Sequence, residues 1–153
     1  MKKKILAVAL ILAMVFTTNV FAYRWVEDGN NWYVVDESNG EFLSSVLLDV
    51  GNNVYFLDSE GKMMTNWWRN DETGKYYFFS NKHDGDYGAM LFGLHTIDGY
   101  LRYFTDDGSL AVADEPGSYK NVYGDYYADS NGELYYLNSL VRDVTEEKSE
   151  YYS

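Results

Sequence analysis

The side chains of this 153-residue sequence that could do chemistry are mainly aromatic rings and carboxylates. Sixteen Tyr, eight Phe and four Trp make the chain 18% aromatic, and 24 Asp and Glu outnumber 12 Lys and Arg, for a net charge of −12. Ring faces attract cations and stack on ligands, whereas carboxylates hold metal ions or transfer protons. Because so acidic a surface repels anionic polymers, we expect no nucleic-acid partner.

Patterns for catalysis and metal binding are weak. The chain has no Cys, and His83 and His95 are its only His residues, so a thiol nucleophile, a Cys-ligated zinc site and a Ser-His-Asp triad have little to build from. The acidic turns at 58–61 and 106–108 lack the spacing of a dedicated calcium loop and are interpreted as ordinary turns. We therefore expect no metal, no cofactor and no catalytic residue.

A short block recurs five times along the chain. Each copy is an aromatic pair, followed in most copies by an acidic or Asn-rich turn that closes on Gly, and a second turn rich in Gly, Asn or Asp precedes the pair. Successive copies are 22, 22, 26 and 23 residues apart, and the long step contains an insertion at 83–88. The copies are aligned on Tyr33, Tyr55, Tyr77, Tyr103 and Tyr126.

Each unit is interpreted as strand, turn, strand, turn. Gly, Asn and Asp supply the positive φ that tight hairpin turns need, and the runs between the turns are rich in Tyr, Phe, Trp and Val, which suit strands. Since one hairpin alone is marginal in water, the units must stack on one another. The sequence therefore predicts an all-β fold, an elongated β-solenoid of about five stacked β-hairpin repeats of about 22 residues.

The N-terminus has the pattern of a secretory signal peptide at 1–22. A basic start precedes an apolar run at 5–16, and 20–22 fits the small-x-small cleavage pattern; an uncleaved N-terminal anchor is the alternative. We expect the repeats to fill 23–138 and the acidic end at 139–153 to form a tail or a cap on the array. The protein is expected to be secreted and associated with the cell surface, with no membrane span after cleavage.

These units resemble the choline-binding and cell-wall-binding repeats of Gram-positive surface proteins. They are also similar to the repeats that end the large clostridial glucosylating toxins. Residues 25–33 share the family's spacing of seven between two Trp, and 93–104 match the toxin type, with Leu94 where Trp is usual. The resemblance covers about 24–137, and the lack of Cys in an exported chain agrees with a Gram-positive source.

The resemblance implies that ligands bind between successive hairpins, in cages of about three aromatic rings. A choline ammonium would be held there by cation–π attraction, and a glycan by stacking and hydrogen bonds. In the first unit, Trp25 and Trp32 are expected to form a cage with Tyr55 of the next hairpin, or with Phe56.

The third unit offers a second cage. It contains Trp67, Trp68 and Tyr76, with Tyr103 of the fourth unit as the expected partner ring. The matching positions of the second and fourth units are aliphatic, so at most two cages are expected. The candidate ligand-binding residues are therefore Trp25, Trp32, Tyr55, Trp67, Trp68, Tyr76 and Tyr103.

The same rings are also explained as a core that seals the hairpin stack. Adjacent Trp67 and Trp68 point to opposite faces of a strand, so one can be core while the other faces solvent. The first hypothesis is a secreted, non-catalytic module that binds choline-bearing or glycan cell-wall polymer. The second is an adhesin-like or structural module, in which the acidic face or the insertion at 82–89 contacts a protein partner. A hydrolase is the third, although a thin array is a poor scaffold for paired acids.

Overall fold

The structure, a computed structural model, describes residues 22–139, so the predicted signal peptide and C-terminal tail fall almost wholly outside the described residues. Within this part the chain is all-β, as predicted: twelve strands form five antiparallel sheets, and helical backbone is confined to 137–139. The strands are β1 (Tyr23–Asp28), β2 (Asn31–Asp36), β3 (Glu41–Phe42), β4 (Val46–Val50), β5 (Asn53–Leu57), β6 (Asn66–Arg69), β7 (Tyr76–Phe79), β8 (Gly93–Ile97), β9 (Tyr100–Phe104), β10 (Lys120–Tyr123), β11 (Tyr126–Ala128) and β12 (Leu134–Tyr136).

Each sheet is centred on one hairpin, and the hairpins follow the predicted turns. β1 pairs with β2, β4 with β5, β6 with β7, β8 with β9, and β10 with β11, while β3 and β12 add a third strand to the first and last sheets. In the β8–β9 turn, Asp98 and Gly99 have φ of 54° and 85°, the positive values that a type I′ turn requires at both central residues.

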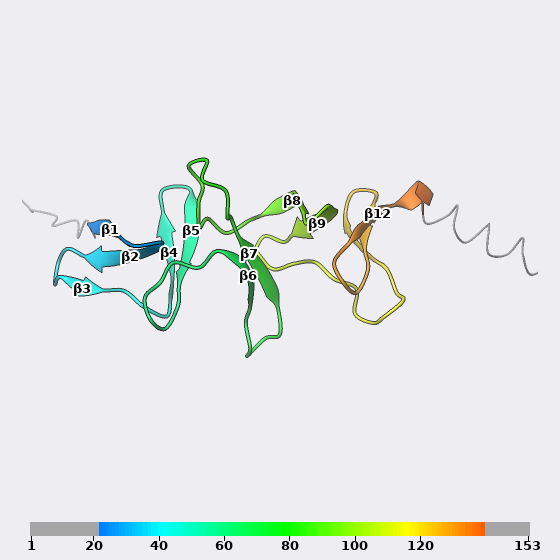
Figure 1. Cartoon of the computed structure of the whole chain (residues 1–153). Helices are drawn as coiled ribbons and strands as arrows, with labels where there is room; N and C mark the ends of the chain where they lie inside the picture. Colours follow the sequence, from blue (N-terminus) through cyan, green and yellow to red (C-terminus); the bar gives the residue numbers. More distant parts are fainter. Residues whose placement is uncertain (1–21, 140–153) are drawn as a thin grey trace, which may run out of the picture.

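The sheets succeed one another along the molecule in chain order, and the described ends of the chain lie at opposite ends of its long axis (Figure 1). They are joined by a recurring backbone hydrogen bond rather than by a continuous ladder. After each of three hairpins, a backbone N–H reaches back to a carbonyl of the preceding one: Met63 to Trp32 at 2.8 Å, Met90 to Val54 at 2.7 Å and Leu110 to Tyr76 at 2.7 Å.

Three glycines pack against the residues that make these backbone links. An added Cβ at Gly88 would meet the side chain of Met63, one at Gly108 would meet Met90, and one at Gly132 would meet Leu110. All three glycines also have positive φ, between 76° and 82°. Close approach and backbone conformation together explain why Gly stands at these three positions.

The core is thin and distributed along the array. Each hairpin contributes a fully buried side chain from its second strand. A core of this form buries each hairpin only against its sequence neighbours. The residues are Val34, Leu57, Phe79, Phe104 and Ala128, each 0% exposed.

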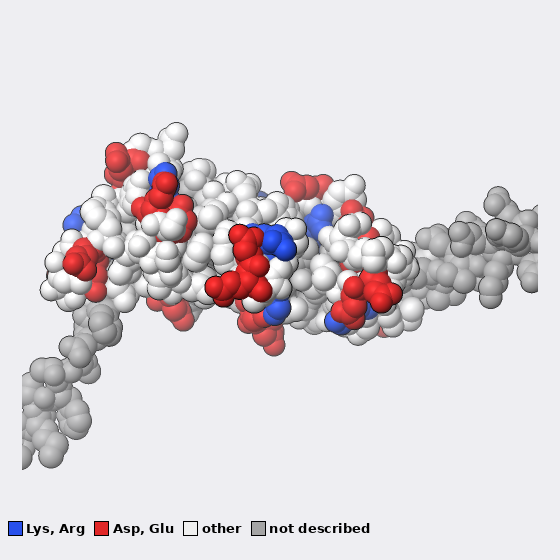
Figure 2. Space-filling model, turned by 90° about the horizontal axis from the view of Figure 1, so that it is seen from below, with Lys and Arg blue, Asp and Glu red and all other residues white. Residues whose placement is uncertain are grey.

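Acidic side chains lie in separate patches along the face shown in Figure 2, several of them beside a Lys or Arg. The described residues hold no group of three His, Cys, Asp or Glu arranged to bind a metal ion, and no helix among them is long and apolar enough to cross a membrane. Because the charge is spread along the molecule, the side chains around each cavity determine its local charge.

Candidate functional site

A cavity between the first two hairpins is walled by three aromatic rings. Trp25 on β1 and Trp32 on β2 share one face of their hairpin, since Trp32 is paired with Glu27, two residues beyond Trp25. Their ring centroids are 6.5 Å apart at 72°, and Tyr55 from β5 meets Trp25 edge-on at 5.0 Å and 68°. The structure thus brings together the three residues expected for the first cage.

The cavity has a volume of about 340 Å³ and a negatively charged rim. Glu27 lines it beside the rings, Met63 contributes a thioether, and no Lys or Arg is among the described lining residues. The faces of aromatic rings are electron-rich, so rings and carboxylate both favour a cation. Neither Glu27 nor Met63 was expected as a site residue from sequence, although Glu27 lies within the matched segment at 25–33.

The insertion in the third unit forms another wall of this cavity. His83, Gly85 and Tyr87 line it, and the rings of His83 and Tyr87 are stacked at 4.0 Å. The Asn53 amide attaches the insertion to the cage, because it donates to Asp86 Oδ1 at 3.2 Å and to the Tyr55 hydroxyl at 3.3 Å. The longer step between repeats marked the insertion in the sequence, but its packing on a hairpin some 30 residues earlier is a non-local contact.

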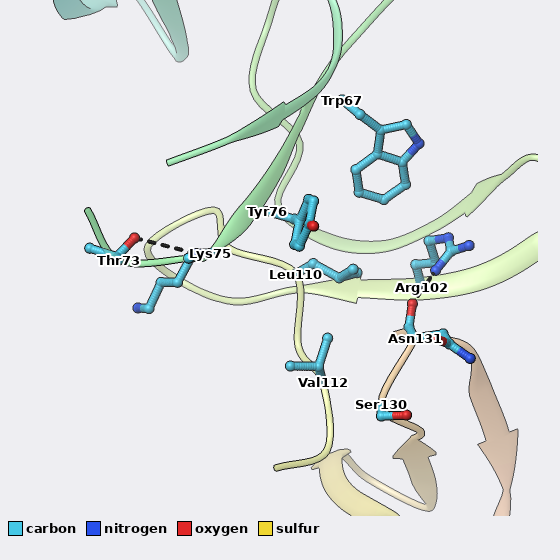
Figure 3. A pocket seen from close by; sticks show the side chains of 10 residues that line it. Trp67, Thr73, Lys75, Tyr76, Arg102, Leu110, Val112, Ser130 and Asn131 are labelled. Atoms are coloured by element: carbon cyan, nitrogen blue, oxygen red, sulfur yellow. Dashed lines mark hydrogen bonds between the residues drawn. The ribbon is translucent and has the colours of Figure 1, made fainter. Parts of the chain in front are cut away.

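A second cavity, of about 580 Å³, lies beside the β6–β7 hairpin. Trp67 on β6 and Tyr76 on β7 stand in the same relation as Trp25 and Trp32, since Tyr76 is paired with the residue two beyond Trp67. The third member is Arg102 on β9, whose guanidinium carbon lies 5.3 Å from the centroid of the Trp67 ring (Figure 3). Arg102 is the third residue of its strand, as Tyr55 is of β5, so a cation replaces the third ring.

The structure does not place Trp68 and Tyr103 among the residues lining this cavity. Trp68 packs on Phe56 at 4.4 Å and on Tyr77 at 5.4 Å, and Tyr103 stacks on Tyr123 at 5.3 Å and 20°. Phe56, the alternative partner for the first cage, contacts Trp68 instead of the first cage's cavity.

An ion pair lies at the edge of the second cavity. The Lys75 ammonium donates to Asp107 Oδ2 at 2.7 Å, and hydrogen bonds from Ser109 and Thr105 reach the same carboxylate. The bond from Lys75, with those from Ser109 and Thr105, holds the pKa of Asp107 far below its ordinary value. Lys75 is thus already paired with a carboxylate, unlike Arg102.

Comparison with solved structures finds this architecture in pneumococcal proteins. CbpF in complex with ipratropium is 26% identical, with a TM-score of 0.60, and the match covers 74% of this chain and 32% of the CbpF chain. Choline-binding protein F from Streptococcus pneumoniae, in another crystal form, is 27% identical with a TM-score of 0.51 and the same 74% coverage of this chain, against 42% of its own. The chain resembles the choline-binding proteins. A pneumococcal cell-wall endolysin from phage Cp-1, complexed with choline, also matches this choline-binding type, with 25% identity and a TM-score of 0.50 over 74% of this chain and 37% of its own.

Curated sequences extend the resemblance to streptococcal enzymes. Glucosyltransferase-S of Streptococcus mutans serotype c is 31% identical over 87 residues, and Glucosyltransferase-I of Streptococcus downei is 30% identical over 84. These matches cover 55% and 54% of this chain but only 5% of each enzyme, so the chain is similar to a small part of them. No family model matches the sequence.

Proposed function

We propose that this chain is a secreted, non-catalytic module that attaches to cell-wall polymer by binding choline groups in the cage of Trp25, Trp32 and Tyr55. The observation that carries the proposal is the enclosure of one cavity by these three rings from two successive hairpins, with a carboxylate at its rim. Similarity to a protein named for choline binding, and to an endolysin complexed with choline, supports it.

The chemistry of the cage suits a quaternary ammonium. A trimethylammonium group has no N–H to donate, so ring faces replace its hydration without leaving a donor unpaired. Each desolvated ring contributes up to about 2 kcal/mol through cation–π attraction. Glu27 adds a counter-charge and the Met63 side chain an apolar, polarisable wall.

The finer architecture belongs to the same proposal. We take residues 23–138 as a β-solenoid of five stacked repeats, preceded by a signal peptide at 1–22 and followed by a tail or cap at 139–153. The three equivalent backbone links between hairpins, and one buried side chain per hairpin, support the stacking.

Tryptophan fluorescence of the protein, titrated with choline, tests this function. We expect saturable quenching, and we expect Trp25→Ala and Trp32→Ala to weaken binding about tenfold each, because each removes one wall worth roughly 1–2 kcal/mol. Trp67→Ala, which removes the equivalent Trp of the third hairpin, is the matched control and should leave choline affinity unchanged. A spectrum that choline does not alter, or an equal loss in all three variants with unchanged circular dichroism, would contradict the proposal.

A further inference from the structure

The second cavity has the ring arrangement of the first but the opposite charge. Trp67 and Tyr76 take the places of Trp25 and Trp32, and Arg102 takes the place of Tyr55. In a chain with 24 acidic residues, no Asp or Glu is among the described residues that line this cavity. The site therefore differs from its neighbour in the kind of ligand that it attracts.

Arg102 has no anionic partner within the described residues. Its Nη1 donates to the backbone carbonyl of Asn131 at 2.8 Å, which fixes the guanidinium, and its Nε is buried without a hydrogen-bond partner. None of the ion pairs found in residues 22–139 includes it. A fixed guanidinium with free donors and no counter-charge is suited to a planar, bidentate anion such as a carboxylate.

The other cations near the cavity are already paired. The Arg69 guanidinium, 5.9 Å from the centroid of the Tyr76 ring, forms an ion pair with Asp71. The Lys75 ammonium is held by Asp107 and points away from the rings in Figure 3. Asp98 lies close by but accepts the Trp67 indole N–H, at 3.4 Å. A quaternary ammonium entering the cavity would be repelled by the guanidinium already lying against the Trp67 ring.

The remaining lining fits a sugar. The Trp67 and Tyr76 rings contribute aromatic surface to the lining, and Thr73, Ser130 and Asn131 add hydroxyl and amide groups. The volume of about 580 Å³ exceeds the roughly 340 Å³ of the first cage. We infer that this cavity binds an acidic sugar, a pyranose ring that carries a carboxylate, with Arg102 as the counter-charge.

The two cavities share no lining residue, so this inference stands or falls independently of choline binding at the first cage. The first test follows the indole N–H of Trp67 by NMR in the ¹⁵N-labelled full chain, titrated with glucuronate, glucose or acetate. We expect a saturable shift with glucuronate and at least tenfold weaker responses with the other two. Equal binding of glucose would overturn the role of Arg102, equal binding of acetate would reduce the site to an ion contact, and no shift with glucuronate would overturn the inference.

Two variants then test whether the charge of Arg102 is responsible for glucuronate binding. Arg102→Gln should weaken glucuronate binding about tenfold or more, as loss of a charge-assisted pair does, whereas Arg24→Gln, which removes the same charge from β1, should not. Undiminished glucuronate binding by a folded Arg102→Gln variant would overturn the inference.

A gain-of-function variant covers the case in which Arg102→Gln does not fold. Arg102→Tyr restores the third ring found in the first cage, so it should lose glucuronate binding and shift the Trp67 indole signal with choline. Retained glucuronate affinity in this variant would also overturn the inference. If choline bound nowhere on the wild-type protein, the proposed function would be contradicted. The inference of an acidic-sugar site would still be decided by the glucuronate titrations.

Discussion

Glu27 and Arg102 stand beside similar ring pairs and carry opposite charges. Each pair consists of two rings set diagonally on one face of a hairpin, so stacking area alone does not distinguish the two cavities. The third residue of the next hairpin's second strand does, because Tyr55 adds a ring whereas Arg102 adds a cation. We therefore expect single side chains at this equivalent position to set the ligand class of each cavity.

At this scale we predict that Glu27→Gln weakens choline binding several-fold and makes it less sensitive to salt. The carboxylate is exposed, so its attraction for the ammonium is modest and screened by ions. Titrations at low and high NaCl measure both effects. Glu72→Gln removes the same charge from the tip of the β6–β7 hairpin and should bind choline as the wild type does; an equal loss there would assign the effect to overall charge.

Hairpins were predictable from the sequence because their determinants are local. Turn residues such as Gly51 and Asp98–Gly99, and aromatic runs between them, set strand and turn with few long-range contacts. The first cage followed from the Trp spacing and its resemblance. The second cavity was predicted only in part. Aligning the repeats on Tyr103 misses its structural equivalent of Tyr55, which is Arg102, by one residue, and a shift of one residue in a strand moves a side chain to the opposite face. The position of Tyr87 beside the first cage could not be predicted either, because it depends on contacts between residues far apart in the sequence.

Between elements, an ion pair joins Lys75, the residue before β7, to Asp107 in the turn after β9, and we predict that this pair contributes to acid stability. Because the pKa of Asp107 is lower in the folded protein than its ordinary 3.8, its stabilising effect is complete above that pH and is lost as the pH falls below it. Asp107→Asn should therefore lower the melting temperature at pH 7 and flatten its decline between pH 4 and pH 2.5. Thermal melts across this range measure both, with Asp106→Asn as the neighbouring control; matching curves for the two variants would contradict the prediction.

Over residues 22–139 the molecule is a row of hairpins, joined to their neighbours by three backbone links and by the close contacts of Gly88, Gly108 and Gly132. In such an array a lesion at one end should open that end without unfolding the other. Gly132→Ala places a methyl against Leu110 at a residue with φ of 76°, so it should destabilise the last sheet, β10–β12.

Hydrogen exchange measures this difference along the chain. We expect Gly132→Ala to accelerate amide exchange in β10–β12 and leave protection in β1–β5, and choline binding at the first cage, unchanged. Gly61→Ala is the matched change near the other end: its added methyl meets the Leu43 carbonyl oxygen, which is backbone and yields little. It should accelerate exchange in β4–β5 and weaken choline binding through Tyr55. Uniform acceleration along the chain in both variants would mean that the hairpins unfold as one unit, and would contradict nearest-neighbour coupling.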